Sequence, residues 1–128
     1  MSNLQLPIIT SIPDLDFFKN IMENNPGLII IKLGATWCGP CKMIEQEVHE
    51  LFEAMPSNVQ CVSIDIDDNI DFYSFLKKKR VVNGVPAIIC YKRGNTSNVP
   101  DDYMIGANKN KLKELQERCI QVAIQIAH

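Results

Sequence analysis

The order of apolar and polar positions predicts alternating strands and helices along the chain. Residues 28–31 form an apolar run without alternation, which is typical of a strand covered on both faces, as in a parallel sheet. Residues 42–55 are amphipathic at helical spacing, and residues 59–66 form a second strand-like run. A strand, a helix and a strand in this order predict two parallel strands joined by a right-handed crossover. The helix would carry these apolar residues on one side: Met43, Ile44, Val48, Leu51 and Phe52.

The segments on both sides of this unit predict further elements. Leu6 to Ile9 could form a first strand, at an edge of the sheet because Pro7 lacks a backbone N–H. A helix from Ser11 to Asn24 would have Ser11 as its N-cap. The later elements are, in chain order, a helix capped by Asp67 or Asp68 that runs to about Lys79, a strand at Ala87–Tyr91, a turn at Lys92–Asn95, a strand within Asp102–Ile105, and a helix from its cap Asn108 to about Ala127.

These elements predict an α/β fold with the order β-α-β-α-β-α-β-β-α, in which helices cover both faces of a mixed central sheet. The length of 128 residues suits one hydrophobic core, so residues 1–128 are expected to form a single domain. A net charge of −2 gives no reason to expect a nucleic-acid or membrane surface. The basic cluster at residues 77–80 is either a solvated helix end or a binding patch, and we favour the first because Lys and Arg suit a helix C-terminus.

The first residues and the cysteine count favour an intracellular, reducing compartment. Residues 1–6 lack the charged segment and long apolar run of a signal peptide, and no apolar run approaches the ~18 residues of a membrane span. Five cysteines are an odd number and too few for a disulfide framework in a chain of this length. We therefore expect a cytoplasmic protein. Its abundance of Ile, Lys and Asn is typical of AT-rich genomes, such as those of viruses, parasites and endosymbionts.

The segment Trp37-Cys38-Gly39-Pro40-Cys41 lies at the turn between the first buried strand and the helix after it. Two cysteines separated by two residues can close a small ring by a disulfide and reopen it, and this spacing in an intracellular α/β chain indicates a redox motif. Free backbone N–H groups at the helix start favour a thiolate on Cys38, whose pKa should fall below the free value of about 8.5. Cys41, one turn further on, should be more buried and more protonated.

Roles follow from these positions. Cys38 would attack a substrate disulfide and form a mixed disulfide, and Cys41 would then attack the Cys38 sulfur and release the substrate as a dithiol. Gly39 would permit close approach of a partner, Pro40 would stiffen the loop, and Trp37 would offer a packing and contact surface. The alternative is that the two cysteines are half of a zinc site, which would need two further ligands at sensible spacing. The other cysteines stand singly and are expected to be small buried apolar residues: Cys61, Cys90 and Cys119.

The five-residue string resembles the active site of the thioredoxin family, and the similarity covers nearly the whole chain. The segments Lys42-Met43-Ile44, Gly84-Val85-Pro86-Ala87 and Gly106-Ala107 are also similar to that family's pattern. The resemblance implies a thioredoxin fold and a protein-disulfide reductase without a cofactor. It further implies that Pro86 is cis and faces the disulfide, that the Val85 backbone pairs with an extended substrate, and that Gly106 forms the third wall of the groove.

The chain departs from the family beside the dithiol. Lys32 stands where the family usually has a buried aspartate, and Ser63 aligns with the lysine that usually faces it. A charged, unpaired lysine in a doubly covered strand would cost several kcal/mol, so we hypothesise a reversed pair with Asp65, whose positive end would favour thiolates. The alternative is that Lys32 turns outward and affects nothing. Gly34 replaces a common aromatic residue, and Gln46 stands where the family often has a kinking proline.

The leading interpretation is therefore a cytosolic thiol–disulfide oxidoreductase that reduces protein disulfides. A more oxidising oxidase or isomerase, or a thioredoxin-fold module that binds proteins without redox chemistry, remain as alternatives. The sequence contains no nucleotide, metal or phosphate motif, so electrons would come from a flavin-containing reductase or another dithiol protein. We expect disulfide-containing proteins as substrates and a monomeric chain, with no nucleic-acid or membrane partner.

Overall fold

The computed structural model describes residues 5–128, so residues 1–4, which entered the argument on a signal peptide, lie outside the described part. The elements are, in chain order, α1 (Leu15–Glu23), β1 (Leu28–Gly34), α2 (Gly39–Met43), α3 (Glu45–Glu53), β2 (Val59–Asp65), the 3-10 turn η1 (Ile66–Asp68), α4 (Ile70–Lys78), β3 (Ala87–Lys92), β4 (Asp102–Ile105) and α5 (Lys109–Ala127).

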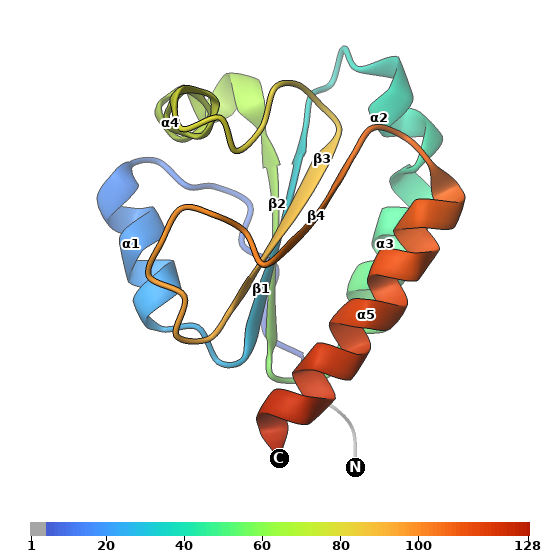
Figure 1. Cartoon of the computed structure of the whole chain (residues 1–128). Coiled ribbons are helices and arrows are strands. Elements are labelled where there is room, and N and C mark those ends of the chain that lie inside the picture. The colour runs from blue at the N-terminus through green and yellow to red at the C-terminus, as the bar shows by residue number, and fades with distance from the viewer. Residues whose placement is uncertain (1–4) are drawn as a thin grey trace.

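The strands form one mixed sheet in the order β2-β1-β3-β4. β1 and β2 are parallel, as the sequence predicts, whereas β3 runs antiparallel to both β1 and β4. Helices α1 and α4 cover one face of the sheet, and α3 and α5 cover the other (Figure 1). The predicted α/β architecture with helices on both faces is confirmed. Within residues 5–128, none of the helices combines the length and the apolar character that crossing a bilayer requires.

Strand β1 is buried on both faces because each face of the sheet carries its own core. Its side chains alternate, with Leu28 and Ile30 packed toward α3 and α5, and Ile29 and Ile31 packed toward α1 and α4. This double burial explains why the sequence of β1 shows no polar alternation. The same alternation places Lys32 on the side of Leu28 and Ile30, toward the helices that follow the cysteine motif.

The predicted first strand is reduced to a single bridge. Ile9 is the one residue of the segment that pairs with β2, donating its N–H to the Cys61 carbonyl at 3.1 Å and accepting the Ser63 N–H at 2.9 Å. Pro7 has no N–H to offer, and its carbonyl accepts a bond from the side chain of Gln60 instead. The prediction of a strand from Leu6 is therefore wrong, because the proline prevents the ladder from extending.

The N-cap of helix α1 lies three residues later than predicted. Asp14, not Ser11, is the N-cap, and its side chain accepts the Phe17 N–H at 2.8 Å. Pro13 disfavours helical geometry at Ile12, which precedes it, so a helix cannot run through from Ser11.

The predicted helix over residues 42–55 is two helices, α2 and α3, with a bend at Ile44. Ile44 is fully buried, but Met43 is 64% exposed, so the prediction that Met43 lies on the buried side is wrong. The bend turns Met43 outward although no proline stands at position 46.

Two polar residues between β2 and α4 differ from their predicted roles. Neither Asp67 nor Asp68 caps α4. Asp65 caps the turn η1 instead by accepting the Asp67 N–H at 2.8 Å, and α4 starts only after Asn69. The cap of α5 at Asn108 and the strand within Asp102–Ile105 are confirmed.

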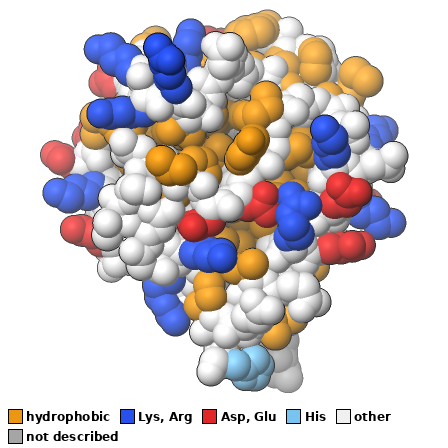
Figure 2. Space-filling view, viewed as in Figure 1, with side chains coloured by type: hydrophobic (Ala, Val, Ile, Leu, Met, Phe, Trp, Pro, Cys, Tyr) orange, Lys and Arg blue, Asp and Glu red, His pale blue; other side chains and the backbone are white. Residues whose placement is uncertain are grey.

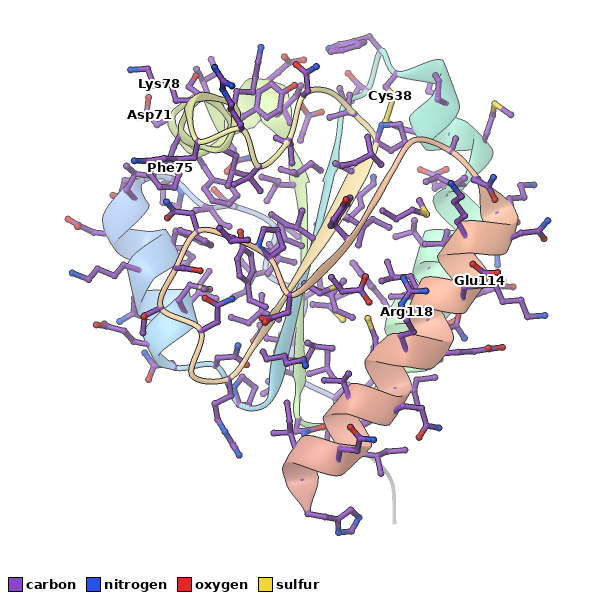
Figure 3. The ribbon with its side chains drawn as sticks, viewed as in Figure 1. Cys38, Asp71, Phe75, Lys78, Glu114 and Arg118 are labelled. Atoms are coloured by element: carbon purple, nitrogen blue, oxygen red, sulfur yellow. A yellow bond between two sulfur atoms is a disulfide. The ribbon has the colours of Figure 1, made fainter. Side chains whose placement is uncertain are left out.

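The basic cluster at residues 77–80 is exposed at the C-terminal end of α4, as the solvated-end interpretation predicts. Figure 2 shows basic side chains gathered at the upper left, over α4, where Figure 3 labels Lys78.

Candidate functional site

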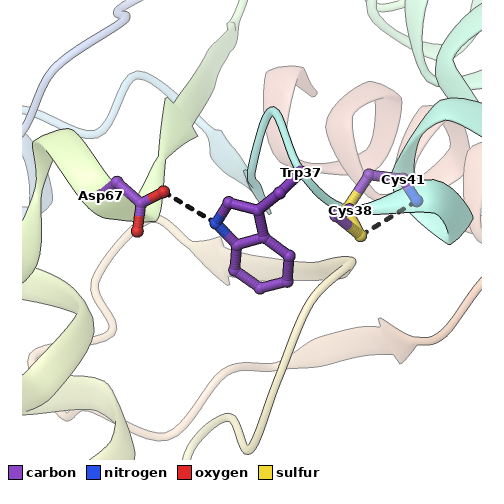
Figure 4. Close-up of a disulfide and its surroundings, with 4 residues drawn as sticks. All are labelled: Trp37, Cys38, Cys41 and Asp67. Atoms are coloured by element: carbon purple, nitrogen blue, oxygen red, sulfur yellow. Dashed lines mark hydrogen bonds between the residues drawn. A yellow bond between two sulfur atoms is a disulfide. The ribbon is translucent and has the colours of Figure 1, made fainter.

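The cysteine motif occupies the turn that leads from β1 into α2. Cys38 is the N-cap of α2, Pro40 lies in the first helical turn, and the Cys38 N–H donates to the Ala35 carbonyl at 3.2 Å. Cys38 and Cys41 form a disulfide with their Cα atoms 5.3 Å apart (Figure 4). The sequence therefore predicted both the place of the motif and the closeness of its sulfurs.

The sulfur of Cys38 is the acceptor of a backbone hydrogen bond. The N–H of Cys41 donates to Cys38 Sγ at 3.1 Å, because the N-cap position aims this side chain at the unpaired N–H groups of the first turn (Figure 4). A hydrogen bond of this kind is stronger to a thiolate than to a thiol, so it favours the anion after the disulfide opens. Cys41 has no equivalent place at the helix start.

The two cysteines are buried to the same extent. Cys38 is 3% exposed and Cys41 is 4% exposed, so the prediction that Cys41 is the more buried residue is wrong. Gly34 lies beside the second sulfur, since a Cβ at that position would stand 3.6 Å from Cys41 Sγ.

A cis peptide bond joins Val85 to Pro86, as the resemblance implied. Pro86 immediately precedes β3, and its carbonyl accepts the Gly106 N–H at 2.9 Å. Gly106, with φ of +93°, follows the last residue of β4, so the loops at Pro86 and Gly106 meet at one edge of the sheet. Among the described residues, the Val85 backbone makes no hydrogen bond to another backbone group. A free N–H and C=O are thus available beside Pro86.

The indole of Trp37 is hydrogen-bonded to Asp67, a residue that the sequence analysis considered only as a helix cap. The indole Nε1 donates to Asp67 Oδ2 at 2.8 Å, while the ring remains 65% exposed (Figure 4). The two residues are 30 positions apart, and no local pattern signals their contact. Figure 2 shows hydrophobic side chains gathered over the upper part of the molecule, the end at which Figure 3 places Cys38. The surface around the motif is therefore apolar as well as open.

A pocket of about 390 Å³ lies beside Cys41 and contains the departures from the family pattern. Lys32, Gly34 and Asp65 all line it. The predicted ion pair between Lys32 and Asp65 does not form, because within residues 5–128 no salt bridge joins the two side chains. That prediction is therefore wrong. The sheet register sets Lys32 opposite Ser63, and the Asp65 carboxylate caps η1.

The Lys32 ammonium nevertheless stays beside the dithiol. Nζ lies 2.7 Å from the point where a Cβ on Gly34 would stand, the same point that lies 3.6 Å from Cys41 Sγ. The two atoms are therefore at most 6.3 Å apart, the sum of these distances. The glycine makes room for the lysine side chain next to the resolving position.

The three remaining cysteines are buried and free, as predicted. Burial raises the pKa of Cys61 to about 12, and a hydrogen bond with Cys119 together with burial holds the pKa of Cys90 well above its ordinary value. In the part of the chain that the structure describes, no group of three Cys, His, Asp or Glu side chains is placed to hold a metal ion.

Comparisons with known proteins agree with this geometry. Residues 9–118 match the family model described as Thioredoxin. A thioredoxin of Ophiophagus hannah is 36% identical over 108 residues, which cover 84% of this chain and 94% of the relative. The mitochondrial thioredoxin-3 of Saccharomyces cerevisiae is 33% identical over 106 residues, with coverages of 83% and 76%. The structure of Trichomonas vaginalis thioredoxin is similar with a TM-score of 0.71 at 26% identity, and the match covers 91% of this chain and 98% of that chain.

Proposed function

This chain belongs to the thioredoxin family, and from that premise we propose that Cys38 and Cys41 are its redox centre, with Cys38 as the attacking thiolate and Cys41 as the resolving thiol. The protein is a thiol–disulfide oxidoreductase of the class that reduces protein disulfides. The observation that carries the assignment of roles is the hydrogen bond from the Cys41 N–H to Cys38 Sγ. The comparisons lend no support to a binding module without redox chemistry.

The reaction follows from this asymmetry. In the reduced protein the Cys38 thiolate attacks one sulfur of a substrate disulfide, the substrate S–S bond breaks, and the other substrate sulfur leaves and takes a proton. Cys41 then loses its proton and attacks the Cys38 sulfur. The Cys38–Cys41 bond forms, the mixed disulfide breaks, and the substrate departs with two thiols. Two electrons have passed to the substrate, and the oxidised centre is the disulfide seen here.

The substrate groove is proposed to lie between Trp37, Val85 and Gly106, with Gly39 and Pro40 at its rim. The unpaired backbone of Val85 supports this placement, because an extended peptide can bond to it as an added strand. Gly39 is open on its outer side, since a Cβ there would meet no atom within 4 Å. Main-chain bonding of this kind tolerates many substrate sequences.

We further propose that Lys32 tunes the dithiol, in place of a direct pair with Asp65. A positive charge within 6.3 Å of Cys41 Sγ stabilises a thiolate at this site more than a thiol. The reduced form is thereby favoured, which makes the couple more oxidising than it would be with a neutral residue. Asp65 lines the same pocket and moderates this positive field.

The thioredoxin family acts on disulfide substrates and is reduced by thioredoxin reductase. For this chain, a flavin-containing reductase or another dithiol protein is the proposed electron donor, and disulfide-containing proteins are the proposed substrates. We propose further that residues 1–128 act as one monomeric domain in the cytoplasm, without a metal or organic cofactor and without a nucleic-acid or membrane partner.

The roles of the two cysteines are tested by paired serine variants in the reduction of insulin disulfides. Cys38→Ser should abolish turnover and form no adduct. Cys41→Ser should accumulate a mixed disulfide through Cys38, because the resolving thiol is missing, and peptide mapping would locate the bond. A mixed disulfide that forms through Cys41 in the Cys38→Ser variant, with undiminished first-step rate, would reverse the assignment.

A further inference from the structure

A second pair of thiols lies close together in the core, apart from the active site. Cys90 in β3 and Cys119 in α5 have their sulfurs 3.6 Å apart and are both free and buried. A disulfide has an S–S length of about 2.05 Å, so each sulfur would have to move by about 0.8 Å toward the other. Small rotations about the side-chain bonds can supply a shift of that size.

An ion pair joins β4 to α5 beside the two cysteines. Asp102 of β4 lies directly across the sheet from Cys90, and Arg118 precedes Cys119 on α5. Arg118 makes two parallel bonds to Asp102, from Nε at 2.8 Å and from the terminal nitrogen at 3.1 Å. A bidentate pair of this kind fixes orientation as well as distance. The neighbours of both cysteines are thus fastened to each other, which keeps the sulfurs in contact.

This pair cannot exchange directly with the active-site disulfide. Cys90 lies three residues along β3 from Ala87, where the strand begins, and three residues of strand span about 10 Å. Figure 3 shows Cys38 at the upper end of the molecule and Arg118 well below it on α5. Oxidation of the second pair therefore needs a reagent that reaches it by another route.

A pocket provides that route. Its volume is about 400 Å³, it is lined mainly by apolar surface between the sheet and α5, and its walls include Leu28, Cys90, Cys119 and Val122. The Asp102–Arg118 pair borders the same pocket. Cys119 is 2% exposed and Cys90 has no exposed surface, so the thiols lie at the wall rather than in open solvent. A small, uncharged oxidant suits such an approach.

We propose that Cys90 and Cys119 are a second redox couple, which hydrogen peroxide entering this pocket converts to a buried disulfide between β3 and α5. Cys119, the more accessible sulfur, attacks one peroxide oxygen, the O–O bond breaks, and a sulfenic acid forms as the first water leaves. The Cys90 sulfur then attacks the Cys119 sulfur, the S–S bond forms, and the second water leaves. The two thiols lose two electrons and two protons, and one peroxide becomes two waters.

The second couple reacts more slowly than the first. Both thiols are buried, which limits access of peroxide to Cys119. The hydrogen bond with Cys119 and burial raise the pKa of Cys90, so the Cys90 thiolate that closes the disulfide is scarce. The active-site pair should therefore oxidise first, and the second pair only under sustained exposure. The closed bond would cross-link the last helix to the sheet.

The test is a count of free thiols in the full-length chain with all five cysteines. The protein is exposed to increasing hydrogen peroxide, denatured, alkylated with N-ethylmaleimide and weighed by intact mass. We expect three alkylated cysteines at first, when only Cys38 and Cys41 are joined, and one at higher exposure. Peptide mapping should then find Cys90 joined to Cys119 and the alkyl group on Cys61. Dithiothreitol should restore five alkylated cysteines.

Single alanine variants provide the matched comparison. Cys61→Ala should still form the second bond, whereas Cys90→Ala and Cys119→Ala should not. The melting temperature of the wild type should rise by about 5 °C or more on formation of the bond, and that of Cys119→Ala should not. Three alkylated cysteines at every exposure, a new bond to Cys61, or oxygen adducts without a cross-link would each overturn the proposal. The peptide map of the wild type decides the question even where a variant fails to fold.

Discussion

Replacing Lys32 by methionine isolates the charge beside the dithiol. Methionine keeps an unbranched side chain of similar reach, so the substitution removes the ammonium and leaves most of the packing in β1 unchanged. The pocket next to Cys41 has room for either side chain, because Gly34 contributes no Cβ. Any change in the redox properties of the variant therefore reports on the charge.

The expected magnitude follows from the distance between Lys32 Nζ and Cys41 Sγ, which is at most 6.3 Å. At that separation a unit pair interacts by about 0.7 kcal/mol in water and about 2.6 kcal/mol at an effective dielectric constant of about 20. Lys32 is half-buried and its pocket is open to solvent, so a value near about 1 kcal/mol is appropriate. This corresponds to a rise of roughly 0.5–1 unit in the pKa of the Cys41 thiol on removal of the charge.

Two assays measure the effect. The thiol pKa is obtained from the pH dependence of alkylation of the reduced protein, and the reduction potential from Trp37 fluorescence in glutathione and dithiol buffers. The potential of Lys32→Met should become more negative by up to about 30 mV, and by less at pH values where the thiolate is only partly formed. Lys19→Met, which removes an exposed charge from α1 on the other face of the sheet, controls for net charge.

Gly34→Ala provides an independent perturbation of the same contact. The new Cβ would stand 2.7 Å from Lys32 Nζ, so the flexible end of the lysine must move away. Its effect on the potential should have the same sign as that of Lys32→Met. The reasoning is refuted if Lys32→Met titrates like the wild type and its potential agrees with that of Lys19→Met, since a charge at this distance cannot then act on the thiolate.

Two further predictions concern stability. The Asn69 side chain is 3% exposed, accepts the Ile12 N–H at 2.7 Å and donates to the Asp65 carbonyl at 2.8 Å. Asn69→Ala should therefore lower the free energy of unfolding in urea by about 2–4 kcal/mol. A loss no larger than that of Asn24→Ala, which removes one exposed hydrogen bond, would contradict this. Burial raises the pKa of Cys61 from 9.0 to about 12, so between these pH values the unfolded chain releases a proton that the folded chain retains, and stability of the reduced protein should fall as pH rises. The slope should be at most about 1.4 kcal/mol per pH unit and should be smaller in Cys61→Ala. An equal fall of the urea midpoint with pH in both proteins, from about pH 8 to about pH 10, would count against a raised pKa.

The sequence predicted most of the elements because their signals are local. The uninterrupted apolar run of β1, the helical spacing of α5 and its cap Asn108 depend on residues within one or two turns of each other. The errors occurred where a local signal competed with another. Pro7 ended the first strand at a single bridge, and Pro13 delayed the start of α1.

The reactive pair of the candidate site was equally local. Cys38 and Cys41 are three residues apart, and a helix that starts between them brings both sulfurs to its first turn whatever the rest of the fold does. The cis bond before Pro86 was inferred from family resemblance, because no local signal distinguishes it from an ordinary trans proline. The relative burial of the two cysteines was mispredicted, since it depends on how other elements pack around the motif and not on spacing along the chain.

The sequence by itself determined the strands, the helices and the position of the dithiol at the start of a helix, because these depend on spacing along the chain. Only the tertiary structure decided that Asp67 holds Trp37, that Asp65 caps a turn instead of pairing with Lys32, and that Cys90 meets Cys119. Each of these contacts joins different elements, and its geometry is set by strand register and helix packing. Side-chain partners of this kind follow from how the two faces of the sheet are covered, which no single stretch of the sequence encodes.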